Sequence, residues 1–337
     1  MRKGQIHWIA IAQAIAIIMV VMYHVRLLNA TTGENYVFID NICGFLGHVH
    51  MPVFFLLSGF LLYHTRISVN VKIGNLYKDK VLRLVVPFVF CTILGNMAQI
   101  VFNGFVKHPH DVTVASFFQS FFFAGGYPWP HRWFLMALIL MMLLYPFYKL
   151  VTSNKAVEWI LLLLLVAIQY VSLQAEPNVF CIQQFVEYSP FFFLGILLCK
   201  YRLWQCLAYW WLPFVLWALA IVIYLVPSLW EMAQYGLFAY RLLCVCALIA
   251  TALQLSRYRP MLFSSFRNYI FQIYIFGVAF QAFVELIVWR HLGCPGALVL
   301  PFFVLNVLAG VWLPVLLSKM AEKIPSRLLH VCMGLRQ

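Results

Sequence analysis

The sequence predicts an all-helical protein that crosses a membrane many times. Of its 337 residues, 64% are apolar and only 10% are charged, and the mean hydropathy is +0.90. A water-soluble domain carries about 25% charged residues, so this chain cannot cover itself with a water-facing surface. Apolar runs of about 20 residues, the length that crosses a bilayer, recur along the chain. We expect one transmembrane domain over residues 1–337 with about ten helices.

Ten apolar segments are expected to form these helices, each bounded by polar or turn-forming residues. The fourth is composite: residues 114–125 are too few to span comfortably, and the glycines and prolines of residues 125–130 would break a helix. We therefore expect 114–125 to be an interfacial or re-entrant piece before the span that begins at Trp133. The expected spans cover residues 8–28, 42–63, 81–102, 114–125 with 133–148, 159–171, 185–199, 207–226, 236–255, 269–289 and 298–317.

Charge placement predicts the orientation, because cytoplasmic loops carry the excess of Lys and Arg. With the N-terminus inside, most of the 23 basic residues fall on the cytoplasmic side, including Arg2, Lys3 and Arg336. We expect both termini to be cytoplasmic and the protein to lie in the cell (inner) membrane. The net charge of +13 then consists of short clusters that face anionic lipid head groups, and it requires no nucleic-acid partner.

The nine cysteines include no C-x-x-C pair, which favours neither a disulfide framework nor a zinc site. We expect no metal. His48 and His50 stand two residues apart, about 200° around a helix, which makes them poor joint ligands. His50, directly before Met51, is the better candidate for an acceptor-binding or auxiliary role, although an interfacial position explains it equally well.

His24 closes the first apolar segment, and an ionisable side chain at membrane depth is costly enough to indicate function. Imidazole, with an unperturbed pKa of about 6.5, can accept a hydroxyl proton or carry an acyl group. Gln13 precedes it by eleven residues, about three helical turns, so both side chains share nearly one face. The alternative is that His24, beside Tyr23, simply reaches the outer head groups.

Four other residues are candidates for a binding role. Lys80 and Arg83 lie one turn apart at the start of the third span and suit phosphate groups, although any cytoplasmic loop carries basic residues. Arg241 and Glu285 fall inside spans, where a structural ion pair between them is the first expectation and a place in an acceptor cavity the second.

Trp133, with His131 and Arg132, is expected in an aromatic belt with a basic flank at an outer boundary. A second possibility is that its ring stacks on a sugar.

Three segments, residues 14–24, 50–62 and 80–87, resemble the integral-membrane acyltransferase 3 family in order and spacing, with weaker similarity at 133–135, 190–195 and 273–275. The resemblance implies transfer of an acyl group, usually acetyl from cytoplasmic acetyl-CoA, to a hydroxyl of a glycan or lipid-linked sugar. It implies that His24 is the catalytic residue and that Lys80 and Arg83 correspond to the family's Arg-x-x-Arg element. Acetyl-CoA is then the donor substrate, with no permanently bound cofactor, and Gln13 belongs to the donor side.

The chain departs from the family pattern at three places. Gln13 and Ala14 replace an Arg-Gly pair, Ala10 replaces an acidic residue, and Phe276 and Gly277 stand where many members carry a histidine. An O-acetyltransferase that modifies polysaccharide is the function expected. The alternatives are a transporter or flippase for a sugar or lipid, which would usually show repeats that this sequence lacks, and a family member without catalytic activity.

Overall fold

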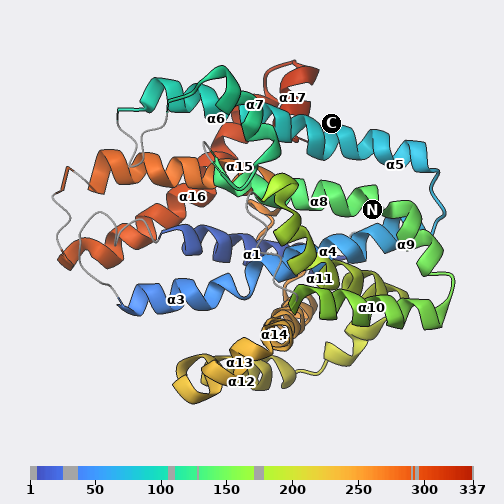
Figure 1. Ribbon diagram of the computed structural model, residues 1–337. Coiled ribbons are helices and arrows are strands. Elements are labelled where there is room, and N and C mark those ends of the chain that lie inside the picture. Colours follow the sequence, from blue (N-terminus) through green and yellow to red (C-terminus); the bar gives the residue numbers. More distant parts are fainter. Residues whose placement is uncertain are drawn as a thin grey trace. The chain divides into compact units, whose positions relative to one another are not determined.

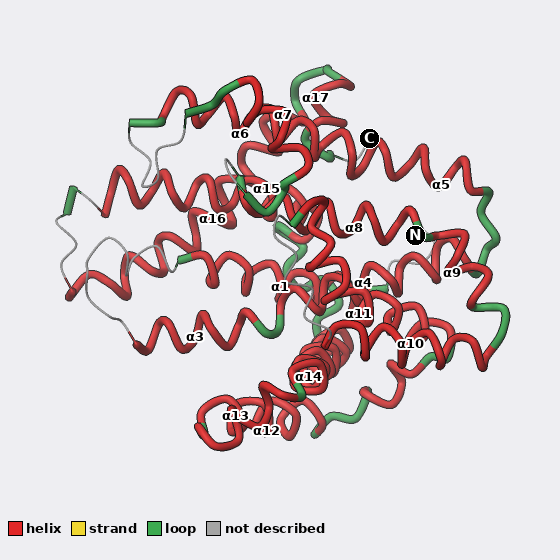
Figure 2. The backbone as a smooth tube through the Cα atoms, in the orientation of Figure 1, coloured by secondary structure: helices red, strands yellow, loops and turns green. Residues whose placement is uncertain are grey.

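The computed structural model describes residues 6–25, 37–104, 111–126, 129–170, 178–289, 291–292 and 296–335. Within these ranges the chain forms helices joined by turns and loops, with no strand (Figures 1 and 2). The predicted all-helical class is confirmed. Arg2, Lys3 and Arg336, on which the predicted location of the termini rested, lie outside the described residues, and the orientation stays a prediction.

Seven described helical segments are long and apolar enough to cross a membrane, and the number rises to nine if each of two bent pairs is one span. The expected fifth span, residues 159–171, falls up to residue 170 on α10 (Lys155–Tyr170), whose 16 residues are fewer than in any of the seven. The structure therefore supports a multi-pass membrane bundle with seven to nine candidate spans among the described residues, and the count of about ten stays a prediction. The seven segments are His7–His24, Phe38–Ile67, Ile73–Phe102, Val179–Lys200, Leu237–Tyr258, Arg267–Trp289 and Val299–Glu322, and the pairs are Pro130–Leu143 with Tyr145–Val151 and Leu212–Leu225 with Pro227–Tyr235.

Contacts divide the chain into two compact units, which we describe separately. The first unit comprises Met1–Leu61 and Gly195–Leu317, and the second comprises Leu62–Leu194 and Ser318–Gln337. The prediction of a single domain over residues 1–337 stays a prediction.

Helix α1 (His7–His24) is the central element of the first unit. It carries no charged residue other than histidine and buries nine side chains, as expected of a helix that is apolar on all sides. It packs against α3 (Val37–Gly47), α14 (Leu237–Tyr258) and α15 (Ile270–Val284).

The rest of the first unit surrounds these helices. Helix α12 (Leu212–Leu225) packs on α14 and turns by 100° into α13 (Pro227–Tyr235). Most of α4 (His50–Leu62) and of α16 (Val299–Glu322), the 3-10 turns η5 (Leu203–Leu207), η6 (Arg267–Tyr269) and η8 (Gly296–Leu298), and the π-turn η7 (Glu285–Trp289) complete it.

Two glycines allow close helix contact beside the last turns of α1. A Cβ atom on Gly277 of α15 would lie 2.9 Å from the carbonyl oxygen of Gly310 in α16. A Cβ atom on Gly310 would in turn lie 2.7 Å from Cγ1 of Val21 in α1. Small residues at membrane helix interfaces let backbones approach in this way. The glycine at position 277, where the resemblance led us to look for a histidine, therefore has a packing role.

We expect Gly310→Ala to destabilise the first unit by about 1–3 kcal/mol, the usual cost of overpacking. The added methyl group would have to displace Val21 or the side chain of Gln281, which is 2.9 Å away at Cγ. Thermal unfolding in detergent measures the effect. Gly236→Ala is the matched control, because nothing lies within 4 Å of a Cβ atom there, and it should shift the transition little. Equal shifts for the two variants would contradict the packing role.

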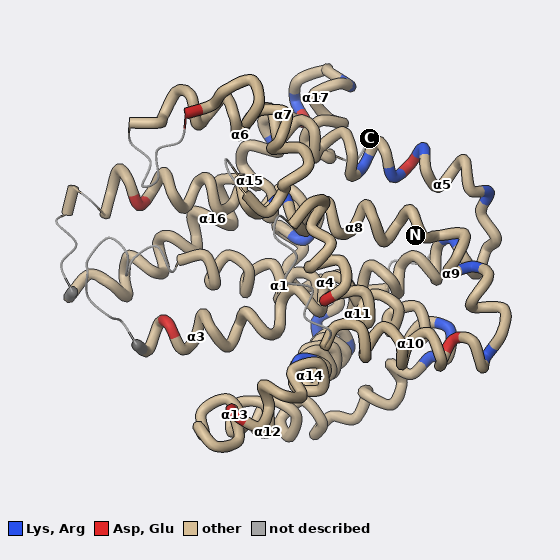
Figure 3. The backbone as a smooth tube through the Cα atoms, viewed as in Figure 1, with Lys and Arg blue, Asp and Glu red and all other residues tan. Residues whose placement is uncertain are grey.

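The second unit is built on a nearly continuous helical segment, α5 (Ile73–Lys80), the π-turn η2 (Val81–Val85) and α6 (Val86–Phe102). Around it lie short helices, and basic residues gather on α5 (Figure 3). Helix α7 (Val114–Phe122) has nine residues, too few to span, as expected for residues 114–125. The other elements are η1 (Tyr63–Ile67), α7 (Val114–Phe122), η3 (Pro130–Arg132), α8 (Trp133–Leu143), α9 (Tyr145–Val151), α10, η4 (Val179–Cys181), most of α11 (Ile182–Lys200) and α17 (Arg327–Cys332).

Arg132 corrects one sequence-based expectation. It is not the exposed basic flank of an aromatic belt, because it is only 2% exposed. Its guanidinium donates to Oγ1 of Thr92 in α6 and to the carbonyl oxygen of Ser120 in α7, both at 2.8 Å, and to the carbonyl oxygen of Trp129 at 2.9 Å. The side chain thus joins α6 and α7 to the start of α8, and hydrogen bonding outweighs the tendency of arginine to reach water.

Candidate functional site

His24 lies at the C-terminal end of α1, and its ring is fixed by the helix that carries it. Nδ1 lies 2.7 Å from the carbonyl oxygen of Val20, one turn earlier. A carbonyl oxygen only accepts hydrogen bonds, so Nδ1 must carry a proton. In the neutral imidazole the lone pair is then on Nε2. Of the two ring nitrogens of His24, Nε2 is therefore the basic one.

Side chains from two neighbouring helices hold the last turn of α1. The backbone N–H of Val25 donates to Met22 rather than to Val21, as helices often do at their ends. Nε2 of Gln281 in α15 donates to the carbonyl oxygen of Val21 at 2.9 Å. Sγ of Cys43 in α3 donates to the carbonyl oxygen of Met22 at 3.4 Å. Both Gln281 and Cys43 are completely buried. The carbonyls beside His24 are thus satisfied from two directions.

His50 repeats the arrangement of His24 on a second element. It is the first residue of α4 and only 3% exposed, and its Nδ1 lies 2.6 Å from the carbonyl oxygen of Leu46. The same argument places the lone pair on Nε2. The ring of Tyr23 lies 5.1 Å from each of the rings of His24 and His50. The structure therefore brings together two histidines, each with Nδ1 bonded to a backbone carbonyl oxygen, around one tyrosine.

His48 lies in the turn between α3 and α4, not on a continuous helix as the 200° argument assumed. Its ring is enclosed by Tyr224 of α12, Trp230 of α13 and Tyr240 of α14, with ring centroids 5.0–6.2 Å away. Nδ1 is buried and has no hydrogen-bond partner among the described residues. The turn breaks the helix and sends the two histidines into different surroundings.

Arg241 of α14 belongs to this region, because it is close enough to His48 and His50 to interact electrostatically with both. His24 has the same relation to His50. We call His24, His48, His50, Tyr23 and Arg241 the histidine cluster.

The ring enclosure of His48 could not be found from sequence. Tyr224, Trp230 and Tyr240 belong to three elements far along the chain from His48, and aromatic residues make up 18% of the sequence. No local motif singles them out from the others.

Gln13, Glu285 and Trp133 are not placed in the histidine cluster by any described contact. Gln13 is half-buried on α1, which is continuous to His24, so the predicted spacing of three turns holds. Glu285 is buried at the start of η7, and its pairing with Arg241 stays a prediction. Trp133, in the second unit, stacks on Tyr188 with centroids 5.6 Å apart, which occupies one face of its ring.

Lys80 and Arg83 lie in the second unit at the junction of α5 and η2. The helix changes from α to π geometry directly after Lys80, so the three-residue spacing is not that of a regular α-turn. Lys80 interacts electrostatically with Arg66, Arg83 and Asp79, and Arg66 pairs with Asp79. Three cations with one carboxylate leave this junction positively charged, as a phosphate-binding role requires.

The described residues contain no group of three or more His, Cys, Asp or Glu side chains that could hold a metal ion. A small cavity of about 60 Å³ opens beside Lys80, between α5, η2 and α8. It is too small for a nucleotide, which would have to bind over the surface of the junction. Its lining consists of Tyr77, Lys80, Val81, Leu84, Val85, Ile139, Met142 and Leu143.

Comparison with known proteins gives one match. A family model described as an acyltransferase domain matches residues 6–319, nearly the whole chain. Searches of curated proteins and of solved structures found no significant match.

Proposed function

The chain belongs to the acyltransferase domain family, and from this premise we propose that it is an O-acetyltransferase acting on a glycan. A membrane acyltransferase follows from the family and from the apolar helices. Our proposal adds acetyl-CoA as the donor, a hydroxyl of a cell-surface or lipid-linked glycan as the acceptor, and the cell (inner) membrane as the location. The observation that carries it is the Nδ1 contact of His24, which leaves Nε2 as a base.

In the proposed reaction, Nε2 of His24 accepts the proton of the acceptor hydroxyl. The hydroxyl oxygen attacks the thioester carbonyl carbon, the carbon–sulfur bond breaks, and the CoA thiolate takes the proton from the imidazolium. General-base catalysis of this kind contributes a factor of about 10²–10⁴. If the acetyl group has to be handed across the membrane, the same nitrogen serves as its carrier. His50 is the auxiliary residue, since its Nδ1 contact matches that of His24 and its ring also lies beside Tyr23.

Label transfer tests the proposal. Wild-type protein in native lipid, with endogenous glycans, is incubated with acetyl-CoA labelled in the acetyl group. We expect label in the glycan as an ester that mild base releases. No label in any glycan, with acetyl and longer acyl donors alike, would contradict the proposal. A flux assay with sugar or lipid in vesicles would then test the transporter alternative.

We propose that Lys80 and Arg83 bind the phosphates of the donor and that Gln13 lies on the donor side. The double variant Lys80→Gln with Arg83→Gln should raise KM for acetyl-CoA by about a hundredfold or more, because each of the two charge-assisted hydrogen bonds contributes about 1.5–3 kcal/mol. kcat should change less. Lys72→Gln with Lys78→Gln is the matched control, because both lysines are exposed at the same helix. Equal effects of the two double variants on KM would mean that only general charge matters.

Gln281 is expected to act by positioning His24. In Gln281→Leu the carbonyl oxygen of Val21 loses its side-chain donor, which costs about 1–3 kcal/mol for a buried group and loosens the last turn of α1. Displacement of a catalytic group by about 1 Å can cost as much as 10²-fold, so we expect kcat to fall about tenfold with KM unchanged. Gln234→Leu, on the exposed surface of α13, is the control. A change in KM alone would contradict this role.

A further inference from the structure

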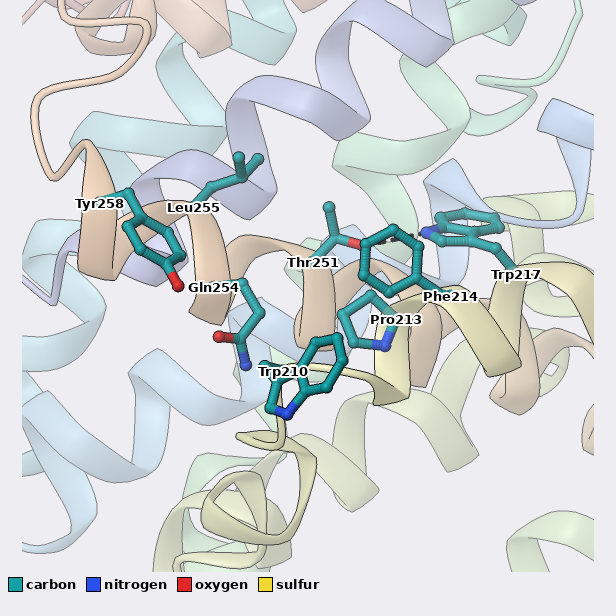
Figure 4. A pocket seen from close by; sticks show the side chains of 8 residues that line it. All are labelled: Trp210, Pro213, Phe214, Trp217, Thr251, Gln254, Leu255 and Tyr258. Carbon is teal, nitrogen blue, oxygen red and sulfur yellow. Dashed lines mark hydrogen bonds between the residues drawn. The ribbon is translucent and has the colours of Figure 1, made fainter.

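A groove between α12 and α14 is separate from the histidine cluster and has no part in the proposed reaction. Its volume is about 510 Å³, within the range of about 300–1,000 Å³ typical of ligand sites. Figure 4 shows aromatic rings from α12 and the turn before it facing side chains of α14. The lining consists of Trp210, Pro213, Phe214, Trp217, Thr251, Gln254, Leu255 and Tyr258.

The polar atoms in the wall of the groove are largely engaged within the protein. Oγ1 of Thr251 accepts from Nε1 of Trp217 at 2.9 Å and donates to the carbonyl oxygen of Ala247 at 2.8 Å. Nε2 of Gln254 donates to the carbonyl oxygen of Ala208 at 2.9 Å, and its Oε1 accepts from Arg257 at 3.3 Å. Thr251 and Gln254 therefore offer little hydrogen-bonding capacity to a polar ligand. The groove therefore suits an apolar chain.

Exposed aromatic side chains line the groove, as they do where a membrane protein meets the lipid interface. Trp210, Phe214 and Tyr258 are 69%, 71% and 76% exposed, and α14 is one of the candidate spans. Exposed Trp and Tyr side chains concentrate at the boundary between head groups and hydrocarbon. An acyl chain that enters the groove from this boundary would belong to a lipid whose head group lies at the opening of the groove.

Two arginines supply the charge at this opening. Arg257 and Arg259 are exposed at the C-terminal end of α14, and within the described residues neither forms an ion pair. The hydrogen bond from Arg257 to Gln254 fixes one guanidinium directly beside the lining of the groove. Basic residues near a membrane surface attract anionic lipid with about 1 kcal/mol each, and guanidinium groups bind phosphate in a bidentate manner.

We propose that the α12–α14 groove binds one acyl chain of an anionic phospholipid, with the lipid phosphate held by Arg257 and Arg259. The proposal does not depend on acyl transfer. It does connect to the histidine cluster, because the ring of Trp217 in the groove contacts Phe45 at 6.1 Å, and Phe45 contacts Tyr224 at 5.4 Å. Tyr224 is one of the three rings around His48. The bound lipid thus supports the helix that encloses His48.

Native mass spectrometry of the purified full-length protein tests the site. The protein in detergent receives equal amounts of palmitoyl-oleoyl phosphatidylglycerol and phosphatidylcholine, and the lipid retained is counted at matched collision energy. We expect the wild type to retain phosphatidylglycerol at least severalfold more than phosphatidylcholine. Arg257→Gln with Arg259→Gln should reduce that ratio to about one. Lys319→Gln with Lys323→Gln, which removes two exposed charges from the end of α16, should leave it unchanged.

Two further measurements test recognition of the acyl chain rather than of the head group. Thr251→Trp fills the groove and should lower retention of both lipids. Dihexanoyl phosphatidylglycerol, too short to fill the groove, should be retained severalfold less by the wild type, a result that needs no variant to fold. The proposal is overturned if the wild type shows no preference between the head groups. It is also overturned if both double variants lose the preference equally, or if the short-chain lipid is retained as well as the long one.

Discussion

Replacing His24 by alanine should lower kcat for acetyl transfer by about 10²–10⁴, the range that general-base catalysis contributes. Nε2 of His24 is the base in the proposed reaction, and the contact of Nδ1 with the carbonyl oxygen of Val20 holds the ring at the end of α1. A radiolabel assay with saturating acetyl-CoA measures the loss. KM for acetyl-CoA should change little, because the proposed donor contacts involve other residues.

His7→Ala is the matched control for this variant. It removes the same side chain from the first residue of the same helix, where it is exposed, and activity should be retained. Both variants should elute from size exclusion as the wild type does and keep their helical circular dichroism. Full activity of folded His24→Ala protein would contradict the role assigned to His24.

Replacing Arg132 by leucine should have the largest effect on stability, about 3–5 kcal/mol lost from the second unit. The change leaves Oγ1 of Thr92 and the carbonyl oxygens of Ser120 and Trp129 without this donor, and hydrogen bonds to charged groups contribute about 1.5–3 kcal/mol each. Arg132→Lys should recover only part of the loss, because an ammonium group lacks the planar fork of guanidinium. Thermal unfolding in detergent measures both.

Arg327→Leu is the control, since that arginine is exposed on α17 of the same unit. It should change the free energy of unfolding by less than about 0.5 kcal/mol, the usual limit for surface substitutions. If Arg132→Leu is as stable as Arg327→Leu, the hydrogen bonds of Arg132 do not hold α6, α7 and α8 together.

The sequence was informative wherever apolar runs or local order determine the structure. Composition predicted the helical membrane class, and the run ending in His24 corresponds to α1. Residues 114–125 were expected to be too short to span, and α7 has nine residues. Helical periodicity is a local property, so one sequence suffices to detect it.

Contacts between distant parts of the chain could not be predicted in the same way. Nothing near Gln281 indicates that its amide donates to Val21, and nothing near Tyr224 indicates that its ring faces His48. Arg132 was misplaced because a basic residue beside tryptophan is typical of the membrane boundary, whereas its hydrogen-bond partners come from α6 and α7. The turn at His48 was missed, although Gly47 directly precedes it, because the apolar run over residues 42–63 predicted one continuous span.

Chemical rescue tests the role of His24 most directly. His24→Gly protein is incubated with labelled acetyl-CoA and acceptor glycan, with and without free imidazole. We predict little transfer without imidazole and a rate that rises with imidazole concentration, whereas wild-type protein should not respond. Transfer by His24→Gly at the wild-type rate without imidazole would contradict the assignment of His24 as the base.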